Sequence, residues 1–125
     1  MSTHTIDTDE TTTIAQIKTQ MKQWVAARNW EKYHLPKNLA SSVSIEAGVL
    51  LEMFQWLTPD DVIAKSKDPA FRLAVSEEMV DVLMYLISLA NVMEIDLAES
   101  VVHKMAKNEK KYPAEKFQGH YERPI

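Results

Sequence analysis

The 125-residue chain contains no cysteine and only two glycines, and each shortage narrows the folds open to it. Without cysteine there is neither a disulfide framework nor a thiolate-bound zinc site. Scarce glycine disfavours a turn-rich all-β fold and suits long helices. The length is that of one domain, and short helical chains often bury extra apolar surface by associating. We therefore expect an all-α protein.

Positive charge is outnumbered, since the chain has 14 lysines and arginines against 18 acids and a formal net charge of −4 at pH 7. This balance argues against a general nucleic-acid binder, which is usually basic. The lysines gather near the C-terminus, where segment 103–118 holds five lysines and two acids. A locally basic segment in an acidic protein suits a small phosphate-bearing ligand better than a duplex.

Long apolar runs are missing as well. The longest, from Val82 to Met93, is interrupted by Ser88 and Asn91 and is too short to span a bilayer. The polar N-terminal segment lacks the apolar core of a signal peptide. The sequence thus predicts a cytoplasmic protein with no membrane partner and no nucleic-acid partner.

Apolar residues spaced three and four apart predict four helices joined by short connectors. The helices are expected near residues 12–29, 37–56, 69–94 and 96–112, with a short helical turn after Thr58. The residues expected to face inward include Leu51, Leu83, Leu86 and Met93. The expected organisation is a disordered leader at 1–11, a helical-bundle domain at 12–113 and an extended tail at 114–125.

Two acidic patterns could carry chemistry. Glu78 and Asp81 are three residues apart, so they share one helix face, and Tyr85 lies one turn further on. Glu46 interrupts an apolar run, where a carboxylate is expensive to bury unless it is paired or binds a metal. Two such helices facing each other could surround a hard cation such as Mg²⁺. The alternative is that the acids are solvated, with Glu46 facing a lysine or arginine.

The last expected helix carries groups of the opposite character. Lys104, Asn108 and Lys111 follow one helical stripe, and cationic and amide donors on one face can hold phosphate oxygens. The aromatic and histidine side chains of segment 30–34 could stack on a base or hydrogen-bond to it. The alternatives are a solvated lysine face and ordinary aromatic packing.

Four sequence blocks, taken in order, resemble the dCTP-pyrophosphatase branch of the MazG-like family. The blocks are NWEKYHLPKNL at 29–39, IEAGVLLEMFQW at 45–56, EEMVDVLMYL at 77–86 and KMAKNEKKYP at 104–113. The resemblance extends over roughly residues 13–118. It implies an all-α, four-helix fold that assembles as a homodimer or as a homotetramer of paired dimers.

The resemblance also implies an activity, the hydrolysis of a nucleoside triphosphate to the monophosphate and pyrophosphate. The family uses Mg²⁺, for which Mn²⁺ is a possible substitute, held by an E-x-x-E and an E-x-x-D motif. Here the first motif reads Glu46-Ala47-Gly48-Val49, so valine stands where the family has its second acid. Glu52 is a further candidate ligand, although it lies about 120° of helix azimuth from Glu46.

Matching positions inherit expected roles from the resemblance. The expected catalytic and metal-binding residues are Glu46, Glu78 and Asp81, with Glu52 as the additional metal candidate. The residues expected near the triphosphate are Lys104, Asn108, Lys111 and Tyr112. The residues expected to shape the base and sugar pocket are Trp30, His34, Asn38, Trp56 and Tyr85.

Three functions stay open at this point. The first is a magnesium-dependent pyrophosphohydrolase with a reduced metal site, acting on pyrimidine deoxynucleotides or non-standard nucleotides in a house-cleaning role. The second is a nucleotide-binding MazG-like protein whose catalysis is impaired because Val49 replaces a metal ligand. The third is a purely structural helical dimer. The first is preferred because the other blocks are intact.

Overall fold

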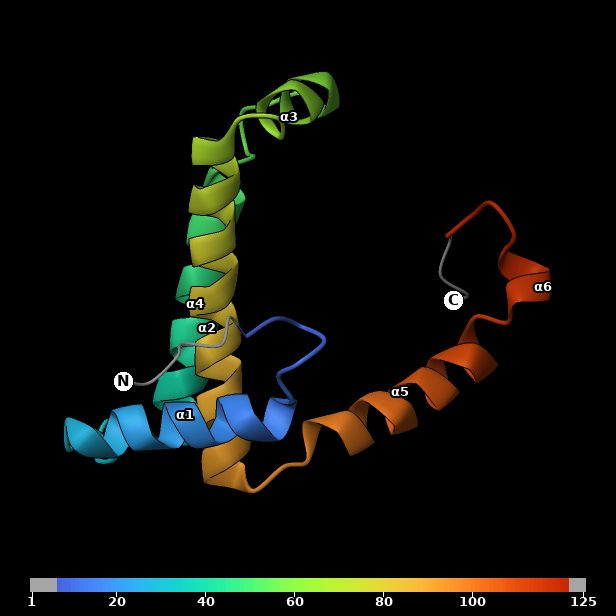
Figure 1. Cartoon of the computed structure of the whole chain (residues 1–125). Coiled ribbons are helices and arrows are strands. Elements are labelled where there is room, and N and C mark those ends of the chain that lie inside the picture. The colour runs from blue at the N-terminus through green and yellow to red at the C-terminus, as the bar shows by residue number, and fades with distance from the viewer. Residues whose placement is uncertain (1–6, 122–125) are drawn as a thin grey trace. The chain divides into compact units, whose positions relative to one another are not determined.

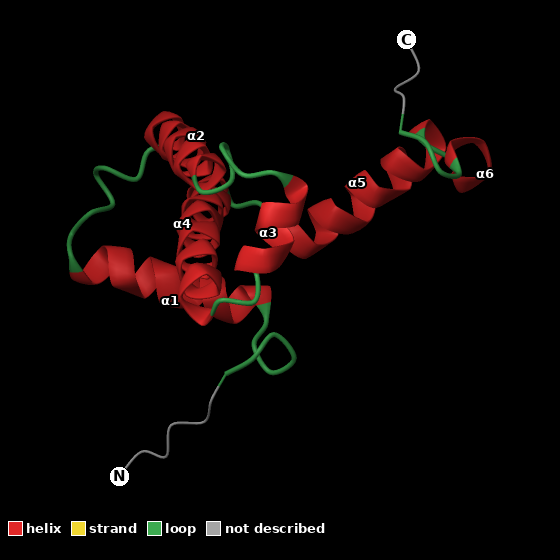
Figure 2. Ribbon diagram, turned by 90° about the horizontal axis from the view of Figure 1, so that it is seen from above, coloured by secondary structure: helices red, strands yellow, loops and turns green. Residues whose placement is uncertain are grey.

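A computed structural model describes residues 7–121, and every regular element in that range is an α-helix (Figure 2). The helices are α1 (Ile14–Ala27), α2 (Pro36–Glu52), α3 (Pro59–Lys65), α4 (Pro69–Met93), α5 (Leu97–Lys111) and α6 (Ala114–Phe117). The all-α prediction is therefore confirmed. Most of the leader expected at 1–11 lies outside the described residues, and Thr8 and Thr11 form a hydrogen-bonded turn at its end.

Side-chain caps set where several helices begin. At the start of α1, Thr13 Oγ1 accepts from the Gln16 backbone N–H, and Gln16 Oε1 accepts from the Thr13 N–H. This reciprocal pair satisfies two backbone donors that the first helical turn leaves unpaired. Asp68 caps α4 and Asp96 caps α5 by accepting from backbone N–H groups in the same way. These starts agree with the sequence-based expectations.

The described chain up to Glu94 forms one compact unit. Within it, α2 packs alongside α4, and α1 crosses α4 (Figure 1). Its buried apolar residues are Met21, Val25, Leu39, Ile87 and Ala90. The Asn91 side-chain amide donates to the Lys18 backbone oxygen at 3.0 Å, which ties α4 to α1 at their crossing.

Apolar side chains also remain on the surface of this unit. The inward-facing prediction for Leu51, Leu83, Leu86 and Met93 is wrong for the single chain, because these side chains are 62, 42, 41 and 53% exposed. For Leu83, Leu86 and Met93 the physical reason is that α4 is apolar on several sides, whereas α1 and α2 are the helices of its unit that pack against it. Part of the apolar surface is therefore left uncovered.

The chain from Ile95 onward forms a second compact unit and is described by itself. Tyr112 and Phe117 meet edge to face, with ring centroids 5.2 Å apart. The expected extended tail at 114–125 is wrong over Ala114–Phe117, which forms α6, because Lys116 and Phe117 donate backbone hydrogen bonds to Pro113. In the described part of the chain, no helix is both long enough and apolar enough to cross a membrane.

Candidate functional site

Three carboxylates converge where α2 and α4 pack together. Glu46 comes from α2, and Glu78 and Asp81 come from one face of α4. One carboxylate oxygen from each lies within 4.8 Å of the others, with Glu46 and Glu78 half-buried and Asp81 exposed. The helix spacing that places Glu78 and Asp81 on one face was readable in the sequence, and the packing of α2 on α4 adds Glu46.

The cluster perturbs the ionisation of its central member. A hydrogen bond with Glu46 is the largest cause that raises the pKa of Glu78 to about 7, followed by burial and by the charges of Glu46 and Asp81. A shared proton between two carboxylates stabilises the protonated form. The Oε1 atom of Glu78 is buried and accepts no hydrogen bond from any residue in the described range.

This arrangement fits a divalent cation. Carboxylate oxygens are the ligands that hard cations prefer, and a bound cation would partner the Glu78 oxygen and replace the shared proton. Val49 follows Glu46 by one helical turn and offers no ligand atom. Glu52 is exposed and is not a member of the described cluster. The site therefore has three converging carboxylates.

A cavity of about 500 Å³ adjoins the cluster. Glu46 and Asp81 form part of its wall, together with the expected pocket residues Trp30, His34 and Tyr85. Four further lining residues were not among the predicted site residues: Gln20, Met21, Trp24 and Met84. The volume is within the range of small-molecule sites, and a mixture of apolar walls with a few polar groups is typical of them. Acids and aromatic rings thus share one cavity.

The aromatic wall is built by two tryptophans in contact. The rings of Trp24 and Trp30 meet edge to face at 5.2 Å, and the Arg28 guanidinium lies 4.0 Å from the Trp24 ring centre. Arg28 also donates to the Trp24 backbone oxygen at 3.0 Å, so the cation is held in place. These contacts fix Trp24 and Trp30 in an orientation that could receive a flat ring.

His34 occupies a tight turn at the edge of the same cavity. Its backbone N–H donates to Trp30 and Glu31, which fixes the residue after α1. Its Nδ1 atom is buried and has no hydrogen-bond partner among the described residues. His34 also lines a second, largely apolar cavity of about 320 Å³. The fold therefore leaves one polar atom of His34 without a hydrogen bond inside the described part of the chain.

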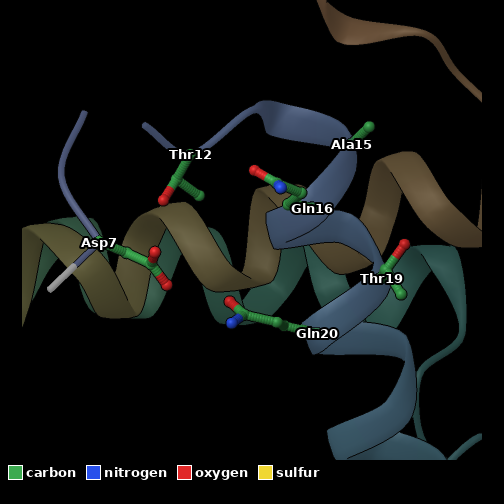
Figure 3. Close-up of a pocket in the computed structure, with 6 residues that line it drawn as sticks. All are labelled: Asp7, Thr12, Ala15, Gln16, Thr19 and Gln20. Carbon is green, nitrogen blue, oxygen red and sulfur yellow. The ribbon is translucent and has the colours of Figure 1, made fainter. Parts of the chain in front are cut away.

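A shallower polar cavity lies at the N-terminal end of α1. Figure 3 shows Asp7 and Thr12 from the preceding segment beside Gln16, Thr19 and Gln20 of α1. Gln20 is the residue that this cavity shares with the larger one. Gln20 therefore lies at the boundary between the two hollows.

Two of the predicted pocket residues lie elsewhere in the first unit. The exposed Asn38 donates from its side-chain amide to the Tyr33 backbone oxygen, which links α2 to the connector before it. Trp56 is 86% exposed. The predicted helix 37–56 ends at Glu52, because Met53 and Phe54 bond to carbonyls three residues back and begin a turn. Neither Asn38 nor Trp56 lines the described cavity in this chain.

The predicted phosphate-contacting residues belong to the second unit. Lys104, Asn108 and Lys111 lie on α5, and Tyr112 follows it. The Tyr112 N–H donates to the Asn108 backbone oxygen at 2.7 Å, and the Lys111 ammonium lies 5.4 Å from the Tyr112 ring centre. The structure thus places Asn108, Lys111 and Tyr112 at the end of α5 and Lys104 two turns earlier, and their role at a triphosphate stays a prediction.

The lining residues that were not predicted from the sequence follow only a weak pattern in it. Gln20 and Trp24 are four apart and so share one face of α1, while Met21 fitted the ordinary pattern of a core residue. Met84 precedes Tyr85 in a strongly apolar helix. Helix periodicity gives the face of each residue but not the cavity that the face meets, because that depends on how α1 crosses α4.

Comparison with known proteins places the chain in a family. The MazG-like family profile matches residues 41–123. The chain belongs to the MazG-like family. This confirms the resemblance to the family, and the matched range contains three of the four blocks, those at 45–56, 77–86 and 104–113.

Two curated relatives are dCTP pyrophosphatase 1 of mouse and of man. The mouse protein is 36% identical over 107 residues, covering 86% of this chain and 63% of the mouse protein. The human protein is 38% identical over 102 residues, covering 82% of this chain and 60% of the human protein. The chain thus spans about three fifths of the length of these relatives.

One solved structure is similar to this chain over nearly the whole length of both proteins. The crystal structure of a pyrophosphatase from Archaeoglobus fulgidus superposes with a TM-score of 0.74 and 39% sequence identity. The match covers 90% of this chain and 99% of that one. The MazG-like helical fold is therefore shared with a solved protein.

Proposed function

We propose that the protein hydrolyses nucleoside triphosphates to the monophosphate and pyrophosphate. The observation that carries the proposal is the carboxylate cluster opening onto an aromatic cavity within one unit. The names of the relatives, dCTP pyrophosphatase 1 and a pyrophosphatase, support the same reaction. The proposed substrates are pyrimidine deoxynucleotides or non-standard nucleotides, removed in a house-cleaning role in the cytoplasm.

The acidic cluster is the proposed metal site, with Mg²⁺ as the physiological ion and Mn²⁺ as a substitute. Glu46, Glu78 and Asp81 would hold it, and Glu52 would assist only through water because it lies outside the cluster. A bound divalent cation supplies charge neutralisation at the phosphate oxygens and polarises the attacking water. Water adds to the α-phosphorus, the bond to the bridging oxygen breaks, and pyrophosphate leaves with that oxygen.

The cavity is the proposed site of the base and sugar. Trp30 and Tyr85 offer flat rings for stacking, and the imidazole of His34 lines the same wall as a hydrogen-bonding group. The remaining proposed substrate contacts are Asn38 and Trp56 in the first unit, and Lys104, Asn108, Lys111 and Tyr112 in the second. Lysines and amides of that second group suit the oxygens of a triphosphate.

Assembly as a homodimer, or as a homotetramer of dimers, is part of the proposal. Met79, Leu83 and Leu86 follow one stripe of α4 and are 55, 42 and 41% exposed. A second copy could cover such a stripe. Sedimentation analysis of Leu83→Glu should then show a smaller mass than the unaltered protein. Glu77→Lys, an exposed charge change on the same helix, should leave the mass unchanged.

The activity is tested by incubating the protein with a panel of deoxynucleoside triphosphates and Mg²⁺ or Mn²⁺. Release of pyrophosphate, lost in Glu78→Gln and kept in Glu77→Gln, is the expected result. Glu77 is a matched control because it neighbours Glu78 and is exposed. No pyrophosphate from any nucleotide would overturn the proposal.

A second function follows from Val49, which leaves three carboxylates where the family motif has a fourth. Under this alternative the protein binds nucleotides without turning them over. Calorimetry separates the two possibilities, since nucleotide affinity without pyrophosphate release supports the alternative. Absence of both affinity and release would support a purely structural role.

A further inference from the structure

The Gln20 carboxamide is a hydrogen-bonding group that the fold does not use. It lines the cavity next to the acidic cluster, and among the described residues it makes no hydrogen bond. The carboxamide oxygen of Gln16, one turn earlier, accepts from the Thr13 N–H in the cap of α1. Figure 3 shows Gln16 and Gln20 projecting from α1, with both terminal amides visible. Gln20 is therefore open to a ligand.

The backbone that carries Gln20 is held firmly. Met21, the next residue, is 5% exposed, and Val25, one turn later, is 7% exposed. Asn91 of α4 donates to the Lys18 backbone oxygen, which fixes α1 along α4 just before Gln20. A polar side chain on a rigid helix can discriminate between ligands, because little conformational entropy of the helix is lost on binding.

The walls of the cavity differ in charge, so the triphosphate and the base of a bound nucleotide suit different walls. The cavity acids lie on α2 and α4, and α1 contains no acidic residue. A metal-bound triphosphate therefore belongs at α2 and α4. The α1 wall, with Gln20 beside Met21 and Trp24, is left to the organic part of the nucleotide. The base is the part that carries hydrogen-bonding groups on a flat edge.

Resting on the proposed function, we propose that Gln20 is a specificity-determining residue that pairs with the hydrogen-bonding edge of a pyrimidine base at its 4-position. A carboxamide presents one donor and one acceptor side by side in a plane, which matches the paired groups on a base edge. Turning the amide over exchanges the two groups. Gln20 thus pairs with the 4-amino group and N3 of cytosine, or with the 4-oxygen and N3–H of uracil.

The indole and phenol groups of the wall serve this purpose less well. The indole N–H of Trp24 or Trp30 donates only, so it cannot form a two-way pair. Tyr85 lies one helical turn from Asp81 and so stands near the acids. Among the described lining residues, Gln20 is the one carboxamide.

The test combines a variant that lacks the Gln20 carboxamide with a nucleotide that lacks the 4-substituent of the base. Gln20→Met keeps the length of the side chain and removes its hydrogen bonds. We expect kcat/KM for dCTP and dUTP to fall about tenfold, mainly through KM. A deoxynucleoside triphosphate whose base is 2-pyrimidinone lacks the 4-substituent but keeps N3, so its kcat/KM should fall by a clearly smaller factor than those of dCTP and dUTP. Gln23→Met, at an exposed position of α1, should leave all three values unchanged.

The outcomes separate this inference from the proposed function. Equal losses on all three nucleotides would mean a structural role for Gln20, and dCTP and dUTP values within about twofold of the unaltered protein would mean no role. Either result overturns the inference while hydrolysis stands. If the unaltered protein releases no pyrophosphate, the same comparison is made by calorimetric affinity for the three nucleotides. Failure to bind any of them overturns the inference as well.

Discussion

Glu46 on α2 and Glu78 on α4 share a hydrogen bond across the contact between the two helices. The bond requires a proton, and it is the largest cause of the raised pKa of Glu78, about 7. Asp81 adds a third negative charge at the same point. Without a cation the cluster therefore favours protonation, and with one it can ionise fully.

Metal affinity should depend on each of the three carboxylates. Glu46→Gln or Asp81→Asn removes a charged ligand with little change of shape, and we expect the affinity for Mg²⁺ or Mn²⁺ to fall about tenfold or more. Isothermal titration calorimetry measures the change. Glu77→Gln is the control with the same chemistry outside the cluster. Equal affinity in all three variants would contradict a metal site here.

A carboxylate at position 49 should strengthen the site. Val49→Glu adds a fourth negative group one helical turn from Glu46, and we expect roughly tenfold higher Mg²⁺ affinity and faster pyrophosphate release. Val49→Gln has the same shape without the charge and should give neither gain. If the two variants behave alike, the fourth carboxylate is dispensable in this chain.

The pH dependence follows from Glu78. Its pKa is raised from an ordinary 4.5 to about 7 in the metal-free fold, so the folded state binds this proton more tightly than the unfolded state. The stabilisation is complete below pH 4.5 and is lost as the pH rises through about 7. Urea unfolding at about pH 5 and about pH 8 should show the loss, and Glu78→Gln should reduce it.

Cation binding should show the opposite trend with pH. Protons and cations compete for the same oxygens, so Mn²⁺ affinity should rise as the pH rises through about 7. Titrations of Mn²⁺ across this range check the trend. An affinity independent of pH would mean that Glu78 is not a ligand.

The cap of α1 should contribute measurably to stability. Thr13→Ala removes the side-chain oxygen that accepts from the Gln16 N–H, and we expect the free energy of unfolding to fall by about 1 kcal/mol. Urea denaturation measures it. Thr19→Ala, an exposed threonine inside the same helix, should not produce this loss. A loss of the same size in both variants would remove the cap as its cause.

The sequence by itself determined the helices and the family. Apolar spacing, caps such as Asp96 and prolines at helix starts act within a few residues, so they can be read locally. The spacing of Glu78 and Asp81 likewise fixed their common face. The limits of the second helix were less readable, because the turn that begins at Met53 depends on backbone bonding rather than on a breaker residue.

Only the tertiary structure decided which faces meet. The packing of α2 on α4 brought Glu46 to Glu78, and the crossing of α1 added Gln20 and Trp24 to the cavity wall. It also left Trp56, expected in the pocket, 86% exposed in this chain. The physical reason is that periodicity defines the direction of a side chain from its own helix. The partner it meets is set by contacts between residues far apart in the chain.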